Sequence, residues 1–159
     1  MAQDARFDDG REAPLNLGAL GGEDLTILSA LAQDAVFPVT EMKWDRVARR
    51  FVCLINRFRW EDRDLAQSQN RAVERVQSLL VISDVSSVSS LGIDRADRDI
   101  ILSLMSIAFD GEPDGAGHVI LTLAGDGAIR VAVDALDVTL RDVTRPYAAP
   151  SGKVPQHPN

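Results

Sequence analysis

Side chains that can bind an anion gather in one short segment of this chain. Between residues 43 and 59 there are six basic residues against a single acid, Asp45, which gives a local net charge of +5. The basic residues are Lys43, Arg46, Arg49, Arg50, Arg57 and Arg59. Guanidinium groups bind carboxylates and phosphates through paired hydrogen bonds, so these six side chains are the candidate binding residues.

The rest of the chain is acidic. Over its 159 residues the formal net charge is −7, and from Val76 to Val143 eleven acids oppose four arginines. Such a balance argues against a general affinity for nucleic acids or membranes, because their phosphates would be repelled. A local basic site remains compatible with it.

Catalytic and metal-binding patterns are sparse. Cys53 lies among apolar neighbours, as an inert core cysteine does, and it is too far in sequence from His118 and His157 to complete a zinc shell with them unaided. The acids at 94–99 and 110–114 lack the spacing of a calcium loop and are expected in turns. The sequence therefore predicts no catalytic residue, no metal and no cofactor, and it leans away from an enzyme.

Periodicity places the basic segment in a β-hairpin. Arg57 and Arg59 alternate with Phe58 and Trp60, so in a strand the two kinds of side chain point to opposite faces. Two interpretations stay open. The arginine face either contacts a partner, or it is solvated or paired with acids of neighbouring strands, as in any half-buried strand.

The register of the hairpin decides which face carries the charges. In one register Trp44 opposes Val52, and a continuous apolar face then forms. Lys43, Arg57 and Arg59 would all lie on the other face. A shift of one residue in the pairing spreads these three over both faces of the sheet.

One helix and a series of strands should position this hairpin. A helix is predicted from Glu23 to Asp34, with Leu25 and Leu28 on its apolar stripe and acids in its first turn. After Pro38 the period changes to two, and every later element is expected to be a strand. The predicted strands cover residues 36–44, 50–60, 75–83, 99–110, 117–124 and 128–142, with a weaker one at 85–90.

Two local patterns shape the predicted sheet. The sequence AGDGA at 124–128 places glycines where a tight hairpin needs positive φ. The apolar positions of 128–142 change parity halfway, which predicts a β-bulge and a sharp bend. We therefore expect an α+β fold, mostly antiparallel β, in which a strongly bent meander forms a partly open barrel or two packed sheets with one N-terminal helix.

Composition also sets the expected boundaries and location. A mobile N-terminal tail is predicted at residues 1–13, a single globular domain at 14–143 and a mobile Pro-rich C-terminal tail at 144–159. A lone cysteine favours a reducing compartment, and the N-terminus lacks the basic start and apolar run of a signal peptide. These features predict a cytoplasmic protein.

Several short motifs together resemble a known family. They are QDAV at 33–36, RF at 50–51, NRFRWE at 56–61, GID at 92–94, the apolar strand at 102–109, GAIR at 127–130 and LRD at 140–142. In this order and spacing the chain resembles a small uncharacterised bacterial family catalogued only as a domain of unknown function (2948 series). The resemblance covers roughly residues 17–143. It implies a single domain and transfers no activity, cofactor or catalytic residue.

Three functions remain as hypotheses. The first is a non-enzymatic cytoplasmic protein-binding or adaptor domain that uses the basic hairpin, or an exposed sheet edge, to contact a partner protein or a second copy of the chain. The second is an anion-binding module for nucleic acid or a phosphorylated metabolite, carried by the six basic residues. The third is an enzyme with a pocket between helix and sheet. No membrane partner is expected.

Overall fold

Strands dominate the computed structural model, which describes residues 13–94, 96–113 and 115–148. The longer strands are β4 (Arg50–Phe58), β5 (Glu74–Ile82), β6 (Val85–Leu91), β7 (Ile101–Gly111), β8 (Gly117–Leu123), β9 (Ala128–Val133) and β10 (Val138–Asp142). The shorter ones are β1 (Asn16–Ala19), β2 (Val36–Pro38), β3 (Met42–Asp45) and β11 (Tyr147–Ala148). Helices α2 (Gly22–Ala32) and α3 (Arg63–Ser68) and two 3₁₀ turns, Val39–Glu41 and Trp60–Asp62, complete the described elements.

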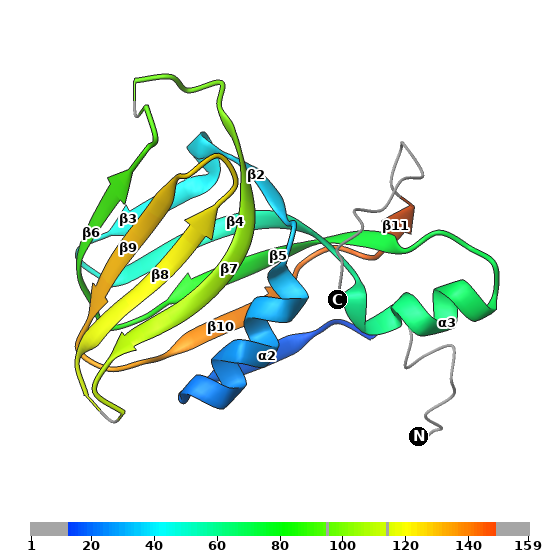
Figure 1. The fold of residues 1–159 in the computed structure, drawn as a ribbon, viewed down its shortest axis with the longest axis horizontal. Coiled ribbons are helices and arrows are strands. Elements are labelled where there is room, and N and C mark those ends of the chain that lie inside the picture. The colour runs from blue at the N-terminus through cyan, green and yellow to red at the C-terminus, as the bar shows by residue number, and fades with distance from the viewer. Residues whose placement is uncertain (1–12, 95, 114, 149–159) are drawn as a thin grey trace.

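The strands form one strongly bent antiparallel sheet (Figure 1). Its order is β1, β10, β5, β4, β2, β7, β8, β9 and β6, while β3 pairs with β4 and β11 pairs with β5. Short β2 contacts both β4 and β7, so it carries the sheet from one layer to the other. The sheet does not close, because β1 and β6 end it without meeting. The predicted α+β, mostly antiparallel, partly open fold is confirmed.

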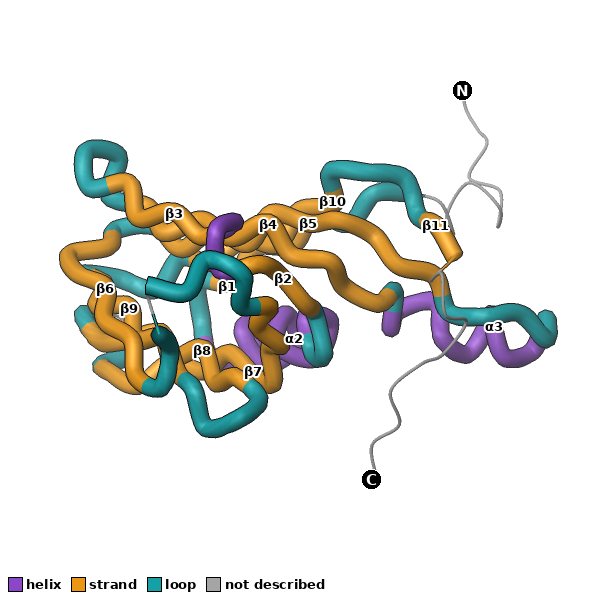
Figure 2. The backbone as a smooth tube through the Cα atoms, turned by 90° about the horizontal axis from the view of Figure 1, so that it is seen from above, coloured by secondary structure: helices purple, strands orange, loops and turns teal. Residues whose placement is uncertain are grey.

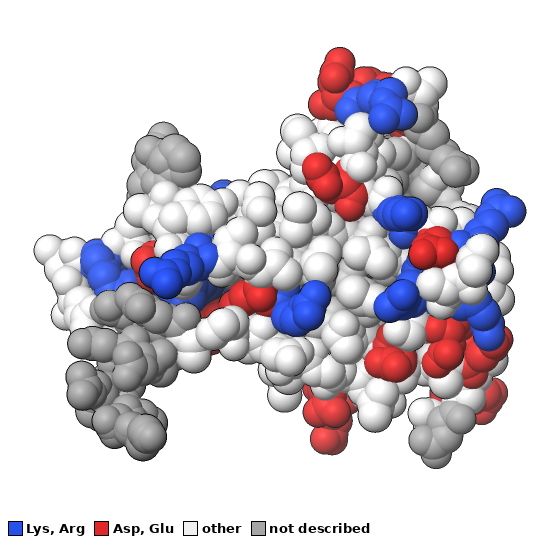
Figure 3. Space-filling view, turned by 180° about the vertical axis from the view of Figure 1, so that it is seen from behind, with Lys and Arg blue, Asp and Glu red and all other residues white. Residues whose placement is uncertain are grey.

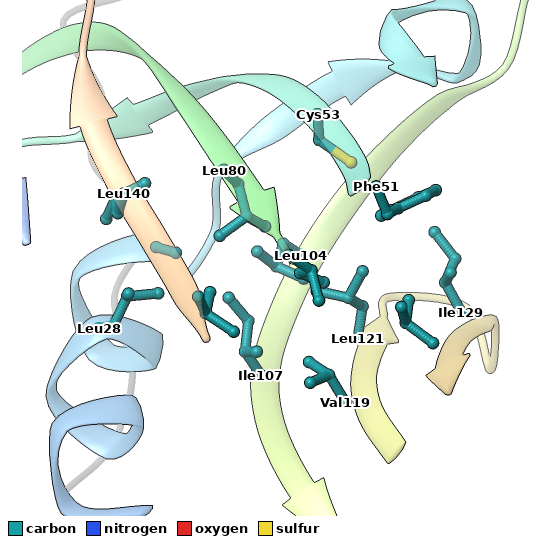
Figure 4. Close-up of a cluster of buried hydrophobic side chains, with 14 of the residues drawn as sticks. Leu28, Phe51, Cys53, Leu80, Leu104, Ile107, Val119, Leu121, Ile129 and Leu140 are labelled. Atoms are coloured by element: carbon teal, nitrogen blue, oxygen red, sulfur yellow. The ribbon is translucent and has the colours of Figure 1, made fainter. Parts of the chain in front are cut away.

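Apolar side chains from both layers fill the space between them (Figure 4). Leu80 and Leu140 enter this core from one layer and Leu104 and Leu121 from the other, and all four are at most 1% exposed. Helix α2 packs against β7 and turns Leu28 and its other buried residues into the same core. Each such leucine contributes roughly 1.5–3 kcal/mol of burial free energy, so the core accounts for the fold.

Pro38 marks the point where the predicted strand 36–44 breaks in two. Proline has no N–H for a strand ladder, and a 3₁₀ turn follows it at Val39–Glu41. Before the turn, β2 pairs with β7 as well as β4. After the turn, β3 pairs with β4 alone, so its outer edge has no neighbouring strand in the described part of the chain.

The predicted strand 128–142 also differs in the structure. It is two strands, β9 and β10, which pair with different layers. The change of apolar parity that we interpreted as a bulge instead marks the crossing between layers at residues 134–137, because each half must turn its apolar side chains inward from an opposite side.

Beyond the core, β4 and β5 extend into an arm that carries α3 (Figure 2). The sequence did not predict α3. A small separate cluster of Phe58, Ala66 and Val73 stabilises it, with Trp60 packed against that cluster. The indole N–H of Trp60 donates to the carbonyl of Gln33, which joins the arm to the end of α2.

The predicted tails fall largely outside the described residues. Residues 1–12 of the predicted N-terminal tail and 149–159 of the predicted C-terminal tail are not described. Within the part that is, Tyr147 pairs with Arg75 of β5, and the Thr144 hydroxyl accepts a hydrogen bond from the backbone N–H of Gln77. No helix in residues 13–94, 96–113 and 115–148 is long and apolar enough to cross a membrane.

Candidate functional site

The structure divides the six basic residues into two groups. Arg57 and Arg59 are buried, with 0% and 3% of their surface exposed. The other four, Lys43, Arg46, Arg49 and Arg50, are exposed and surround the turn between β3 and β4. Several basic side chains gather at the right of the view in Figure 3, with acidic side chains next to them. The six therefore do not form one surface.

The hairpin register explains this division. Met42 opposes Cys53 and Trp44 opposes Phe51, which is one residue away from the register that gives a single charged face. Along β4 the inward series Phe51, Cys53 and Ile55 continues to Arg57. Arg57 thus points into the end of the core, whereas Lys43, which opposes Val52, is exposed.

Arg57 lies at the centre of a buried ion network. Its Nη2 donates to Asp142 Oδ1 at 3.0 Å and to Glu61 Oε2 at 2.8 Å, and its Nη1 donates to Glu61 Oε1 at 2.8 Å and to the Phe58 carbonyl at 3.1 Å. Its Nε donates to Ser78 Oγ at 3.1 Å. These bonds tie β4, β5, β10 and the Trp60–Asp62 turn together, so Arg57 has a structural role.

The charge states of this network are fixed by its contacts. Burial disfavours the charged guanidinium of Arg57, but hydrogen bonds and charge from Glu61 and Asp142 outweigh it and raise the pKa of Arg57. Partial burial likewise opposes ionisation of Glu61, and the hydrogen bonds and charge of Arg57 outweigh it and lower the pKa of Glu61. Both groups are ionised at neutral pH.

Arg59 belongs to a second ion cluster in the arm. Its Nη1 donates to Glu74 Oε1 at 3.0 Å and to Asp62 Oδ2 at 3.4 Å. Arg71 donates to the same Asp62 oxygen at 2.8 Å. This cluster joins the start of β5 to the turn before α3, and it occupies the side chain of Arg59.

At the opposite end of β4, two strand edges face an open slot. Among the strands that the structure describes, β3 pairs only with β4, and β6 pairs only with β9. Both lie at the same end of the molecule (Figures 1 and 2). At one point the gap is bridged, where the backbone N–H of Val85 donates to the Arg49 carbonyl at 3.0 Å. We call this gap the β3–β6 slot, bounded by residues 42–46 and 85–90.

Two open hollows occupy the β3–β6 slot. The first, of about 520 Å³, is lined by Trp44, Arg46, Arg49, Val85, Ser86, Ser87 and Val88. The second, of about 350 Å³, is lined by Val39, Met42, Trp44, Arg46, Phe51, Val88, Ser89, Ser90, Ile93 and Ile129. The first has serine hydroxyls along one wall, and the second has an apolar floor. Both volumes fall in the range of sites that enclose ligand groups.

The two arginines of the slot differ in their contacts. Arg49 donates through Nε to the Val85 carbonyl at 3.2 Å and forms an ion pair with Asp134, whose hydrogen bond and charge raise the pKa of Arg49. Arg46 lines both hollows and is exposed, and its side chain makes no hydrogen bond or ion pair within the described residues. The side chains of Lys43 and Arg50 likewise make none there.

Other candidate chemistry lies away from the slot. Cys53 is completely buried in the core, and burial raises the pKa of its thiol to about 12. The Nδ1 atom of His118, on β8, lies 3.5 Å from Nη2 of Arg130. Among the residues that the structure describes, no three His, Cys, Asp or Glu side chains are placed to hold a metal ion.

The serine-rich wall of the slot was not among the predicted binding residues. Residues 85–91 read VSSVSSL and form β6, which we predicted only as a weak strand. Five of its seven side chains are exposed. A strand with so few buried apolar side chains is typical of a sheet edge, and that signal could have located the slot.

Fold and site together define an open, mostly antiparallel α+β sheet protein with two unpaired strand edges beside a basic turn. A family model described as "Protein of unknown function (DUF2948)" matches residues 15–157, so the chain belongs to this family and the resemblance seen in the sequence is confirmed. Comparisons with curated proteins and with solved structures found no match.

Proposed function

We propose that this protein is a binding module that accepts an extended segment of a partner protein in the β3–β6 slot. The observation that carries the proposal is the pair of strand edges, β3 and β6, that face the slot without a neighbouring strand. Edge strands offer free backbone N–H and C=O groups, and an added strand satisfies them while its alternate side chains enter pockets.

The hollows supply those pockets. Trp44 and Val88 line both of them, so a strand that runs along the slot would bury side chains against the same two residues. Both residues also pack against the main core and are partly exposed, which makes them a firm but accessible surface. Strand β3 has four residues and β6 has seven, so a partner strand of four residues, about 13 Å long, fits along either edge.

Nucleic acid is a weaker fit to this slot. Asp84 and Asp134 lie at one end, where Arg49 contacts them, and Asp94 and Asp97 lie in the loop that follows β6. A polyanion would meet these carboxylates as well as the arginines. The apolar floor also offers Trp44 only half-exposed, which limits the stacking of bases.

A peptide-display selection on the full chain tests the proposal. We expect it to enrich peptides whose binding is lost in Ser90→Tyr, because Ser90 is exposed and pairs with Ile129 on the face of the second hollow, which a bulky side chain there would fill. Thr122→Tyr is the matched control, since Thr122 is exposed on β8 outside the slot, and it should leave binding unchanged.

Two outcomes contradict the proposal. One is a selection in which no peptide is enriched above an empty support. The other is binding that is the same in Ser90→Tyr as in the original chain, with circular dichroism showing both folded. Mass measured by light scattering checks a competing occupant: a dimer abolished by Ser90→Tyr would assign the slot to a second copy of this chain.

A further inference from the structure

We infer that the segment bound in the β3–β6 slot is acidic, with a carboxylate that pairs with Arg46 next to an apolar side chain seated in the second hollow. This inference rests on the proposed function and adds the chemical class of the partner. The two arginines of the slot, Arg46 and Arg49, differ in their contacts, and this difference supports the inference.

Arg49 is committed to the fold and Arg46 is not. The side chain of Arg49 contacts the Val85 and Asp84 carbonyls and the carboxylate of Asp134, which fastens the β3–β4 turn to the start of β6 and to the chain after β9. Arg46 makes no such contact within the described residues, although it borders both hollows. A carboxylate placed there would find a free guanidinium.

The rest of the lining agrees in charge. No acidic residue lines either hollow, and the polar residues between the arginines are the serines of β6. Lys43 and Arg50 add two exposed positive charges around the turn. The nearest acid along the chain, Asp45, is already engaged, because its Oδ1 accepts a hydrogen bond from the Ala48 N–H at 3.0 Å. An acidic ligand is therefore favoured and a basic one is repelled.

The apolar floor sets the position of the second contact. Met42, Trp44 and Phe51 line the second hollow, and Trp44, on β3, precedes Arg46 by two residues. Arg46 lies in the turn directly after β3 and lines the same hollow, so the apolar floor and the guanidinium are neighbours there. A strand laid along β3 would accordingly present its carboxylate two residues from an aromatic or branched apolar side chain.

The same peptide-display selection tests the inference. We expect the enriched peptides to carry Asp or Glu two positions from an apolar residue. For one such peptide, synthesised with a fluorescent label, replacing the acid by its amide should weaken binding about fivefold to tenfold, the range for one charge-assisted hydrogen-bonded pair. Binding should also weaken as salt concentration rises.

Charge reversal at Arg46 gives the sharper result. Arg46→Glu should weaken the acidic peptide at least as much and should bind a version in which the acid is replaced by Lys better than the original chain does. The matched control is Arg141→Glu, because Arg141 is exposed on β10 and its side chain makes no hydrogen bond or ion pair within the described residues. It carries the same charge change and should alter neither affinity.

The outcomes separate this inference from the proposed function. Peptides that bind, are blocked by Ser90→Tyr, but show no excess of acids and no response to Arg46→Glu would overturn the inference and leave the proposed function standing. Failure of the proposed function would appear earlier, as no enriched peptide or as binding that is the same in Ser90→Tyr. If Arg46→Glu weakened the binding of single-stranded RNA but not the binding of the peptides, the inference would be overturned as well.

Discussion

Two arginines near opposite ends of one hairpin serve different purposes because of what surrounds them. Arg57 has a completely buried side chain and bonds to Asp142, Glu61 and Ser78. Arg46 is exposed and makes no hydrogen bond or ion pair within the described residues. A buried charge must be paired to be tolerated, whereas an exposed free charge is available to a ligand.

Removing the carboxylate of Asp142 should therefore strongly destabilise the folded protein. Asp142→Ala leaves the buried Arg57 with only one counter-charge, that of Glu61. It also removes the hydrogen bond that the backbone N–H of Leu15 donates to Asp142 Oδ2 at 2.9 Å. We expect the free energy of unfolding to fall by about 3–5 kcal/mol, as when one partner of a buried pair is lost. Urea unfolding measures it.

The neighbouring exposed residue provides the control for this experiment. Arg141→Ala should change the free energy of unfolding by less than about 0.5 kcal/mol. An Asp142→Ala protein as stable as this control would contradict a structural role for the Arg57 network.

Glu61 should make stability depend on acid. Arg57 lowers the pKa of Glu61 in the folded state, so the contribution of Glu61 to stability is present above its unfolded pKa, about 4.3, and is lost as pH falls through the lower folded value. Glu61→Gln removes this titration. The stability of the original chain should thus fall more steeply below about pH 4.3 than that of Glu61→Gln.

Urea unfolding at a series of pH values between about 3 and 7 checks this prediction. Parallel curves for the two proteins below about pH 4.3 would show that Glu61 has the same pKa in the folded and unfolded states, against the contacts with Arg57.

At this scale the sequence predicted the alternation along β4 correctly but not its setting. Arg57 and Phe58 do point to opposite faces, as their spacing predicted. Whether the arginine face meets water or protein depends on Asp142, which lies 85 residues away along the chain, and no local pattern encodes that pairing. For the same reason, Arg46 could not be distinguished from the other five basic residues of the segment.

Among the elements, the loop end of the β7–β8 hairpin depends on two facing glycines. Gly111 pairs with Gly117, and a Cβ on Gly117 would lie 2.5 Å from the Asp110 carbonyl oxygen and 2.7 Å from the Gly111 Cα. Because both contacts are with backbone, the strands cannot yield without moving apart. This close approach requires glycine.

Gly117→Ala should accordingly destabilise the protein by roughly 1–3 kcal/mol, the usual cost of overpacking. Gly18→Ala is the matched control, since a Cβ there would have no atom within 4 Å. Thermal unfolding followed by circular dichroism compares the two variants. Equal melting temperatures would contradict the backbone clash.

Elements with strong local signals were predicted well. The helix predicted at 23–34 is found at 22–32, and the predicted AGDGA hairpin forms, with positive φ at Gly125 as expected and at Asp126 in place of Gly127. Elements set by long-range pairing were not. The crossing between β9 and β10 looked like a bulge, and α3 depends on packing against Phe58 and Val73, which belong to two different segments.

The whole molecule has one continuous apolar core and, at one end, two described strand edges without a neighbouring strand. Strand β2 passes to β7 while β3 remains with β4, so the two layers separate at their edge and leave the β3–β6 slot. The excess of acids elsewhere on the chain concentrates the positive potential around Lys43, Arg46 and Arg50. Fold class was predictable because periodicity encodes it, whereas the slot arises from the strand order, which periodicity does not reveal.

Hydrogen exchange on the full chain, with and without a peptide from the display selection, tests the central claim most directly. If an extended segment adds to the free edges, backbone amides in residues 42–46 and 86–90 should exchange more slowly in its presence, while those of β1 and β10 stay unchanged. Protection confined to the arm or to α2, or no protection at saturating peptide, would contradict binding in the β3–β6 slot.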